Sequence, residues 1–270
     1  MDVARCIADG NTYTAHNFEQ LGDSRIEGFR RLLVCVQCGA PAFFRKESRS
    51  GQAACFGARP HIPGCEFAAA EGRRRGNPGN DQEEQINLGE RIEIDFGYGA
   101  QEIVHPTPDN PIDPNGRGGR FVPGSGRRSP VMHRRLSTLL RNLMVSEQFR
   151  NSDQIIGLPE GQFRVRDFFV RFNEANRDHV GEYRGYWGML SDARYGQENS
   201  LWLNSGGREN LSVVADTAIV DGLHERFDVD DLEEFAGSYI LVFGTLRVSG
   251  NGKGYVACND LRHITVSLSD

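Results

Sequence analysis

The stretch Cys35-Val-Gln-Cys38, followed by Cys55-Phe-Gly-Ala-Arg-Pro-His61-Ile-Pro-Gly-Cys65, is the part of the sequence that most strongly constrains the fold. Two cysteines with two residues between them are typical of a zinc knuckle, in which a tight turn directs both thiolates at one metal ion. The second segment can supply the other half of a tetrahedral set. The spacing therefore predicts a closed, structural zinc site near the N-terminus.

The predicted ligands are Cys35, Cys38 and Cys65, with either His61 or Cys55 as the fourth. His61 is preferred, because Pro63-Gly64 can turn the chain so that His61 meets Cys65. Disulfides or unrelated buried thiols are the alternatives. No signal peptide opens the sequence, so we expect a reducing, cytoplasmic compartment in which disulfides are rare. A closed zinc site stabilises a fold and does not by itself indicate an activity.

A family resemblance rests on Leu33-Val-Cys-Val-Gln-Cys-Gly-Ala-Pro-Ala-Phe-Phe-Arg-Lys46, Gly51, Cys55-Phe56, His61 and Cys65. This pattern, within residues 2–70, resembles the N-terminal zinc domain of CoiA-like competence proteins. Cys55 stands where that family usually has a first His before Phe, and His61 is also placed differently. A nuclease-like domain follows in that family. The resemblance therefore implies a role in bacterial DNA processing, with a possible setting in a mobile element or a defence system.

Motifs for catalysis are missing. Restriction-type metal nucleases use a Lys two positions after an acidic residue, but the chain has only Lys46 and Lys253, and neither has this neighbour. Phosphate-binding loops and hydrolase motifs are also missing from the sequence. We therefore expect a binding protein rather than an enzyme, with an unrecognised nuclease site as a lesser alternative.

Composition and charge fit a globular protein with an uneven charge distribution. The chain has 270 residues, 38% hydrophobic residues and a formal net charge of −6. It has no apolar run long enough for a membrane span. The net charge does not favour nucleic acid, but the segment between Asp113 and Glu147 contains no acidic residue. Seven arginines lie in that segment: Arg117, Arg120, Arg127, Arg128, Arg134, Arg135 and Arg141.

Four parts follow from patterning: a zinc-binding domain at 1–70, a Gly/Pro/Arg-rich linker at 71–129, a helical part at 130–155 and a final domain at 156–270. The linker includes one alternating strand, 91–98. Ser129-Pro130 and leucines at helical spacing predict an amphipathic helix over 130–149, whose apolar stripe would face a core or a protein partner.

The last part has the element order of an OB-fold, so the predicted class is α+β, mainly β, with a small zinc domain and a C-terminal barrel. Three strands (182–190, 200–204 and 211–215), a short helix (230–236) ended by Gly237, and two further strands (238–248, and 255–258 running on to 263–268) form this order. A different five-stranded barrel or an α+β sheet is the alternative.

OB-folds bind oligonucleotides, oligosaccharides or proteins, and single strands require aromatic rings for stacking and cations for phosphates. The predicted nucleic-acid-binding residues are Arg184, Tyr186, Trp187, Trp202, Arg247, Lys253, Tyr255, Arg134 and Arg141. Either tryptophan could instead fill the barrel. The favoured function is non-catalytic binding of single-stranded DNA or RNA. The alternative is an adaptor that docks proteins through the OB domain and the 130–149 helix.

Overall fold

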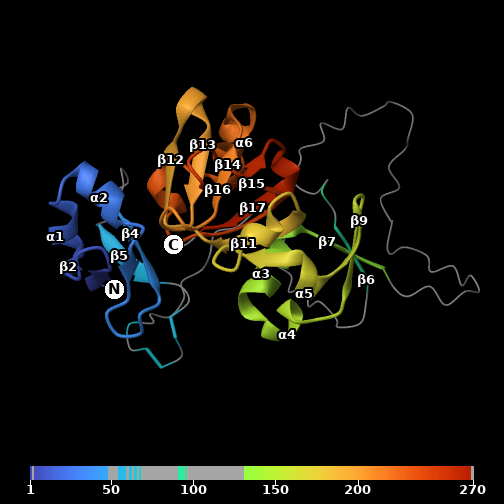
Figure 1. Ribbon diagram of the computed structural model, residues 1–270, viewed down its shortest axis with the longest axis horizontal. Coiled ribbons are helices and arrows are strands. Elements are labelled where there is room, and N and C mark those ends of the chain that lie inside the picture. The colour runs from blue at the N-terminus through green and yellow to red at the C-terminus, as the bar shows by residue number, and fades with distance from the viewer. Residues whose placement is uncertain are drawn as a thin grey trace, which may run out of the picture.

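The computed structural model describes residues 1, 3–47, 54–58, 61–62, 64–65, 67, 91–94, 96 and 131–268, with 131–134 described by their backbone only. The fold is mixed and strand-rich, with short helices. The described strands form three sheets. Figure 1 shows the N-terminal sheet in blue at one end of the long axis, the large C-terminal sheet in the middle, and the third sheet at the other end. Most of the predicted linker, residues 71–90, 95 and 97–129, lies outside the described residues.

The N-terminal sheet is antiparallel throughout. Its strands in spatial order are β2 (Thr12–Thr14), β1 (Val3–Cys6), β3 (Leu33–Val34), β4 (Pro41–Arg45) and β5 (Cys55–Ala58). Two helices, α1 (Ala15–Glu19) and α2 (Asp23–Phe29), connect β2 to β3. Phe18, Phe44 and Phe56 pack edge to face or tilted at its centre, with ring centroids 4.8–5.5 Å apart, and all three are buried.

The C-terminal sheet contains eight strands, with β17 pairing β15 beside the main path. In spatial order they are β10 (Phe169–Arg171), β11 (Tyr183–Met189), β15 (Tyr239–Val248), β16 (Gly254–Cys258), β14 (Ser212–Ala215), β13 (Leu201–Asn204) and β12 (Asp192–Tyr195), and β17 is Ile264–Ser267. β14 and β16 are parallel, as are β10 and β11, whereas the other neighbours are antiparallel.

The third sheet brings together segments far apart in sequence. Its order is β7 (Val131–Arg134), β6 (Arg91–Ile94), β8 (Ile155–Leu158) and β9 (Gly161–Arg164). The alternation that predicted a strand at 91–98 is confirmed over Arg91–Ile94.

The predicted helix over 130–149 is wrong at its start and is interrupted. Residues 131–134 form β7, because they pair in parallel with β6. Helical structure begins at α3 (Leu136–Val145) and resumes in α4 (Glu147–Arg150), after Ser146 caps the second helix through its Oγ, which accepts from the Phe149 N–H at 3.1 Å. The local spacing of apolar residues predicted one helix. Pairing with β6, which is remote in sequence, instead makes the first residues of that segment a strand.

The apolar stripe of α3 is internal. Its four leucines, Leu136, Leu139, Leu140 and Leu143, are at most 5% exposed, and the helix packs against β15 and β17. They share a hydrophobic cluster with Trp187, Leu241 and Phe243. Of the two alternatives that the sequence left open, the stripe is therefore part of the core and does not form a protein-docking surface.

The remaining helices are short, apart from α6 (Thr217–Phe227), which covers one face of the C-terminal sheet. Asp216 caps the N-terminus of α6. The buried face of the helix packs in one hydrophobic cluster with strand residues such as Val213 and Val256. The others are α5 (Val165–Phe168) and the 3-10 helices η1 (Arg177–His179), η2 (Gln197–Asn199), η3 (Leu232–Phe235) and η4 (Leu261–His263). The sequence predicted η3 but not α6 or β12.

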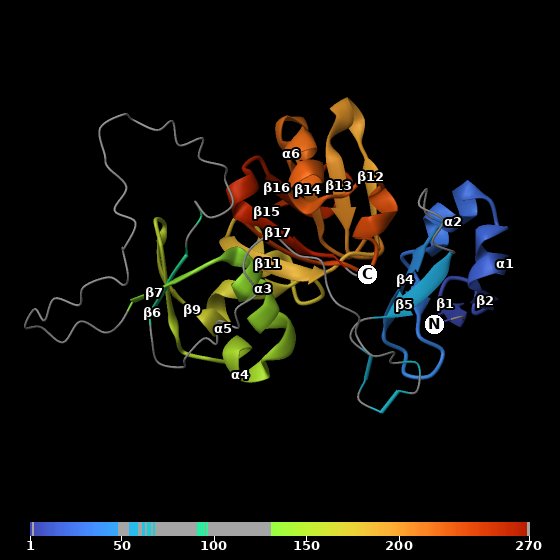
Figure 2. The same ribbon diagram turned by 180° about the vertical axis from the view of Figure 1, so that it is seen from behind.

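The N-terminal sheet is held against the C-terminal part by largely buried ion pairs. Arg30 makes a double hydrogen bond to Glu233, at 3.0 and 2.7 Å, and Arg31 makes one to Asp192, at 2.8 and 2.7 Å. Phe43 completes the contact, because its ring lies over Gly237, where φ is +81° and a β-carbon would clash with the ring. Both ribbon views show the two parts side by side (Figures 1 and 2).

Candidate functional site

The first half of the candidate metal site, called the metal-ligand cluster below and made of Cys35, Cys38, His61 and Cys65, is a tight turn between β3 and β4. The Gly39 N–H donates to Cys35 O at 2.9 Å, and the Cys35 N–H donates to Ala40 O at 2.8 Å. Gly39 has φ +68°, a conformation that favours glycine. This turn brings the Cys35 and Cys38 thiols to the same side of the sheet, as the two-residue spacing predicts.

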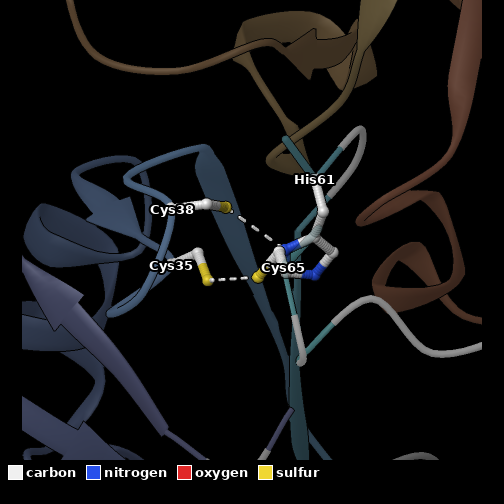
Figure 3. Close-up of side chains that lie close together, drawn as sticks. All are labelled: Cys35, Cys38, His61 and Cys65. Carbon is white, nitrogen blue, oxygen red and sulfur yellow. Dashed lines mark hydrogen bonds between the residues drawn. The ribbon is translucent and has the colours of Figure 1, made fainter. Parts of the chain in front are cut away.

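The second half comes from the segment after β5. His61 and Cys65 approach the turn, and the Cys65 N–H donates to Ile62 O at 3.1 Å. The four ligand atoms of Cys35, Cys38, His61 and Cys65 all lie within 4.8 Å of one another. Figure 3 shows the pairs that face each other: the Cys35 and Cys65 sulfurs at 3.8 Å, and the Cys38 sulfur and His61 Nδ1 at 3.4 Å. This group could hold a metal ion.

Cys55 is not part of this group. It is the first residue of β5 and pairs with Arg45 in the sheet, where it is half-buried with a free thiol. Of the two residues that the sequence left open as the fourth ligand, the structure places His61 with the other three.

The environment of the group favours at least one thiolate. A hydrogen bond from the Ile62 backbone N–H, with further bonds from Ala40 and His61, lowers the pKa of Cys38 to about 6. Burial raises the pKa of Cys65. Cys38 is therefore better prepared than Cys65 to meet a cation at neutral pH, since the thiolate is the form that binds metals.

A second site candidate is the outer face of the neighbouring strands β12, β13, β14 and β16, together with the end of β15 that carries Arg247. In the sheet register Arg194 lies opposite Trp202, and Tyr255 lies opposite Arg247. The rings of Trp202 and Tyr255 are neighbours, with centroids 6.1 Å apart and planes tilted by 40°. Both rings are half-buried, and Arg247 is exposed. Trp202, Tyr255, Arg247 and Arg194 are called the outer face below.

Two of the predicted stacking residues are unavailable to a ligand. Tyr186 is 0% exposed and Trp187 is 1% exposed. They are adjacent on β11 and point to opposite sides: Tyr186 into the cluster beneath α6, and Trp187 into the cluster beneath α3. Because α3 and the third sheet cover the side of β11 that bears Trp187, both faces of this strand are internal.

Two of the predicted phosphate contacts already bind groups of the protein. Arg184 forms an ion pair with Glu182 and donates to Asp167 O at 2.9 Å. Lys253 donates to Gly207 O at 2.7 Å, and burial lowers its pKa to about 8. Arg141 is exposed on α3, away from the outer face, and the side chain of Arg134 lies outside the described residues.

Arg194 was missed at the sequence level. It belongs to β12, a short strand that immediately follows β11, and it forms an exposed ion pair with Glu27 of α2 at 2.6 Å. The signal available was the alternation in Asp192-Ala-Arg-Tyr195, which continues the preceding strand after Leu190-Ser191.

Comparisons with known proteins leave the function open. No family model matches this chain, and no curated protein matches its sequence. One solved structure with local similarity is described as an aspartyl-tRNA synthetase from Leishmania major, at 11% identity and a TM-score of 0.27, covering 38% of this chain and 21% of that one. Within the described residues, none of the helices combines the length and apolar character that a membrane crossing requires.

Proposed function

We propose that the C-terminal sheet is an OB-fold in which β11 and β12 are two halves of one bent strand. β11 pairs with β15, β12 pairs with β13, and only Leu190 and Ser191 separate them. The backbone changes partner at this point: the Leu190 N–H donates to Ser238 O, and the Ser191 N–H donates to Asn204 O. With that continuity, the path β11-β15-β16-β14-β13-β12 returns to its start, and α6 follows β14 as the helix of an OB-fold does.

The function that this arrangement supports best is binding of single-stranded nucleic acid on the outer face. The observation that carries it is the pair of adjacent rings, Trp202 and Tyr255, with Arg247 in register beside Tyr255. Rings and cations at this spacing can stack bases while contacting the phosphates between them. The face contains no acidic residue of its own strands beyond the buried Asp192, whose charge Arg31 compensates.

In this proposal the Cys/His group binds zinc as a structural ion. A tetrahedral zinc with Zn–S bonds of about 2.3 Å places its sulfur ligands about 3.8 Å apart. The Cys35 and Cys65 sulfurs are 3.8 Å apart, and the set of three thiols and one imidazole is a common structural zinc set. The zinc-bearing part borders the outer face, since Glu27 contacts Arg194. Its resemblance to CoiA-like zinc domains supports a setting in DNA processing.

A protein-binding adaptor is the second candidate function. The net charge of −6 disfavours nucleic acid as a partner. Ile62, next to the ligand His61, is 55% exposed, and Phe67, just after Cys65, is 37% exposed. These apolar side chains, rather than the buried leucines of α3, would be the docking residues.

The test is a fluorescence anisotropy titration with a labelled pyrimidine oligonucleotide at low salt. The proposal expects saturable binding that weakens with salt, with a slope of about 0.7 for each phosphate neutralised. Trp202→Ala should cost about 1–3 kcal/mol of binding free energy without lowering the melting temperature sharply. Tyr195→Ala is the matched control, because Tyr195 is 51% exposed on the same hairpin and hydrogen-bonds to His224 instead of lying on the outer face.

Absence of binding at micromolar protein, or equal affinity for the two variants, would reject the outer face and favour the adaptor. Incubation of the same oligonucleotides with magnesium or manganese tests the remaining alternative. The proposal expects intact strands. Cleavage that co-purifies with the protein and disappears on mutation of an Asp or Glu would instead identify an enzyme.

A further inference from the structure

A pocket of about 280 Å³ lies where α3, α4, β10 and β11 meet, away from the metal-ligand cluster and the outer face. Its floor is apolar and buried, since Leu143, Phe169 and Trp187 are at most 9% exposed. The walls and rim are polar and carry charges of both signs. They consist of Glu147, Arg150, Asn151, Arg166, Arg171 and Glu174.

The guanidinium of Arg171 is positioned in this pocket by stacking on the Trp187 ring and not by an ion pair with a carboxylate. Its guanidinium carbon lies 5.0 Å from the centroid of the Trp187 ring, with which Arg171 is in register across β10 and β11. Among the described residues it has no hydrogen-bond or ion-pair partner for its side chain, which is half-buried. A guanidinium fixed by stacking keeps its N–H groups free to bind an oxyanion.

Arg150 is a second fixed guanidinium. Its Nη1 donates to Leu143 O at 2.7 Å, at the C-terminal end of α3, and lies 3.4 Å from Met144 O. These bonds fix the group through one nitrogen and leave its other N–H groups without a partner among the described residues. Arg166, exposed at the rim, has its Nη2 3.1 Å from an oxygen of Asp153, which partly balances its charge.

The carboxylates of the pocket restrict the ligand further. Glu147 and Glu174 are exposed, and among the described residues neither forms an ion pair with the arginines. Carboxylates in this position accept hydrogen bonds from hydroxyl groups and repel a long polyanion such as a nucleic-acid backbone. The volume is also slightly below the range of about 300–1,000 Å³ that accommodates drug-sized ligands.

We propose that this pocket binds a small phosphate ester that carries hydroxyl groups, such as a sugar monophosphate. Arg150 and Arg171 bind the phosphate, since guanidinium groups match the geometry of phosphate oxygens. Glu147 and Glu174 accept hydrogen bonds from the hydroxyls.

The test uses the fluorescence of Trp187 in the full-length chain. The protein has two tryptophans, so a Trp202→Phe variant leaves Trp187 as the single reporter. Ribose 5-phosphate is titrated in phosphate-free buffer, with inorganic phosphate and ribose as separate titrants. The expected result is a saturable change in emission, with ribose 5-phosphate binding more tightly than phosphate and ribose giving no change. Isothermal titration calorimetry measures the same binding without using the fluorescence of Trp187.

In this background Arg171→Gln should weaken ribose 5-phosphate binding by about tenfold or more, because it removes a charge-assisted contact. Arg177→Gln should have no effect, since Arg177 is an exposed arginine outside the pocket. The proposal is overturned if millimolar ribose 5-phosphate gives no saturable signal by either method. It is also overturned if the ester binds no more tightly than phosphate, or if Arg171→Gln binds as the parent does. Nucleic acid is not involved in these measurements, so they do not depend on the outer face.

Discussion

The N-terminal and C-terminal sheets differ in what stabilises them. The N-terminal sheet has a small core in which three of the four candidate metal-ligand residues, Cys35, Cys38 and Cys65, themselves belong to or pack against the hydrophobic cluster. The strands of the C-terminal sheet contribute residues to two separate hydrophobic clusters, one beneath α6 and one beneath α3. Small domains bury too little apolar surface to be stable without further support, whereas larger ones supply enough from side chains alone.

The contact between the two parts depends on ion pairs, whereas each part has its own hydrophobic core. Arg30 and Arg31, next to each other in sequence, bind Glu233 and Asp192 of the C-terminal part in nearly buried ion pairs. Such pairs are specific in geometry but costly to break on one side, because the remaining charge stays buried. The comparison therefore predicts that metal loss, a broken contact and acid will act in order of decreasing severity.

Loss of a metal ligand should have the largest effect. Cys38→Ser should remove bound zinc and unfold the N-terminal sheet, because metal binding and folding are one equilibrium in small zinc modules. Elemental analysis should find about one zinc per chain in the parent and none in the variant. Cys55→Ser is the matched control and should retain the metal, since Cys55 lies outside the cluster. If Cys55→Ser loses zinc while His61→Ala keeps it, the assignment of the fourth ligand is wrong.

Breaking one contact between the parts should have an intermediate effect. Arg31→Ala leaves the charge of Asp192, which is 2% exposed, without its ion-pair partner, so the free energy of unfolding should fall by about 3–5 kcal/mol. Arg194→Ala removes an ion pair whose side chains are 49% and 58% exposed and should cost less than about 1 kcal/mol. Urea unfolding of the two variants measures the difference. Equal losses would show that burial of the Arg31–Asp192 pair does not matter.

Lowering the pH from 7 to 5 should have the smallest effect on the stability of the protein. Burial raises the pKa of Asp192, but the hydrogen bonds and charge of Arg31 outweigh it, so the pKa lies below the ordinary value. The resulting stability is present above the ordinary Asp pKa of about 3.9 and is lost as pH falls through the lower, folded-state value. Melting temperatures between pH 7 and 5 should therefore change little through this group. Asp192→Asn should be less stable than the parent at neutral pH, and the difference should narrow below about pH 4.

The sequence predicted what depends on local pattern and missed what depends on distant partners. The knuckle at Cys35 and Cys38 follows from spacing, and the strands β13 to β17 follow from apolar runs between turns. His61 could be preferred over Cys55 as the fourth ligand but not assigned from the sequence, because the choice depends on the register of β5, which holds Cys55 against Arg45. β7 was read as helix because its partner β6 is remote. The sequence did not decide whether Trp187 lies in the core or on the binding surface, because the answer depends on where α3 packs.

Hydrogen–deuterium exchange with and without a chelator tests the central claim of this account most directly. The account predicts that metal removal accelerates exchange in β3 and β4, around Cys35, while the first part of β15, residues 239–244, which is buried on both faces, keeps its protection. Peptides covering the contact at Glu233 should show a smaller increase as the N-terminal sheet detaches. Unchanged exchange throughout, or equal loss of protection in β4 and β15, would contradict the claim that a metal stabilises the N-terminal sheet alone.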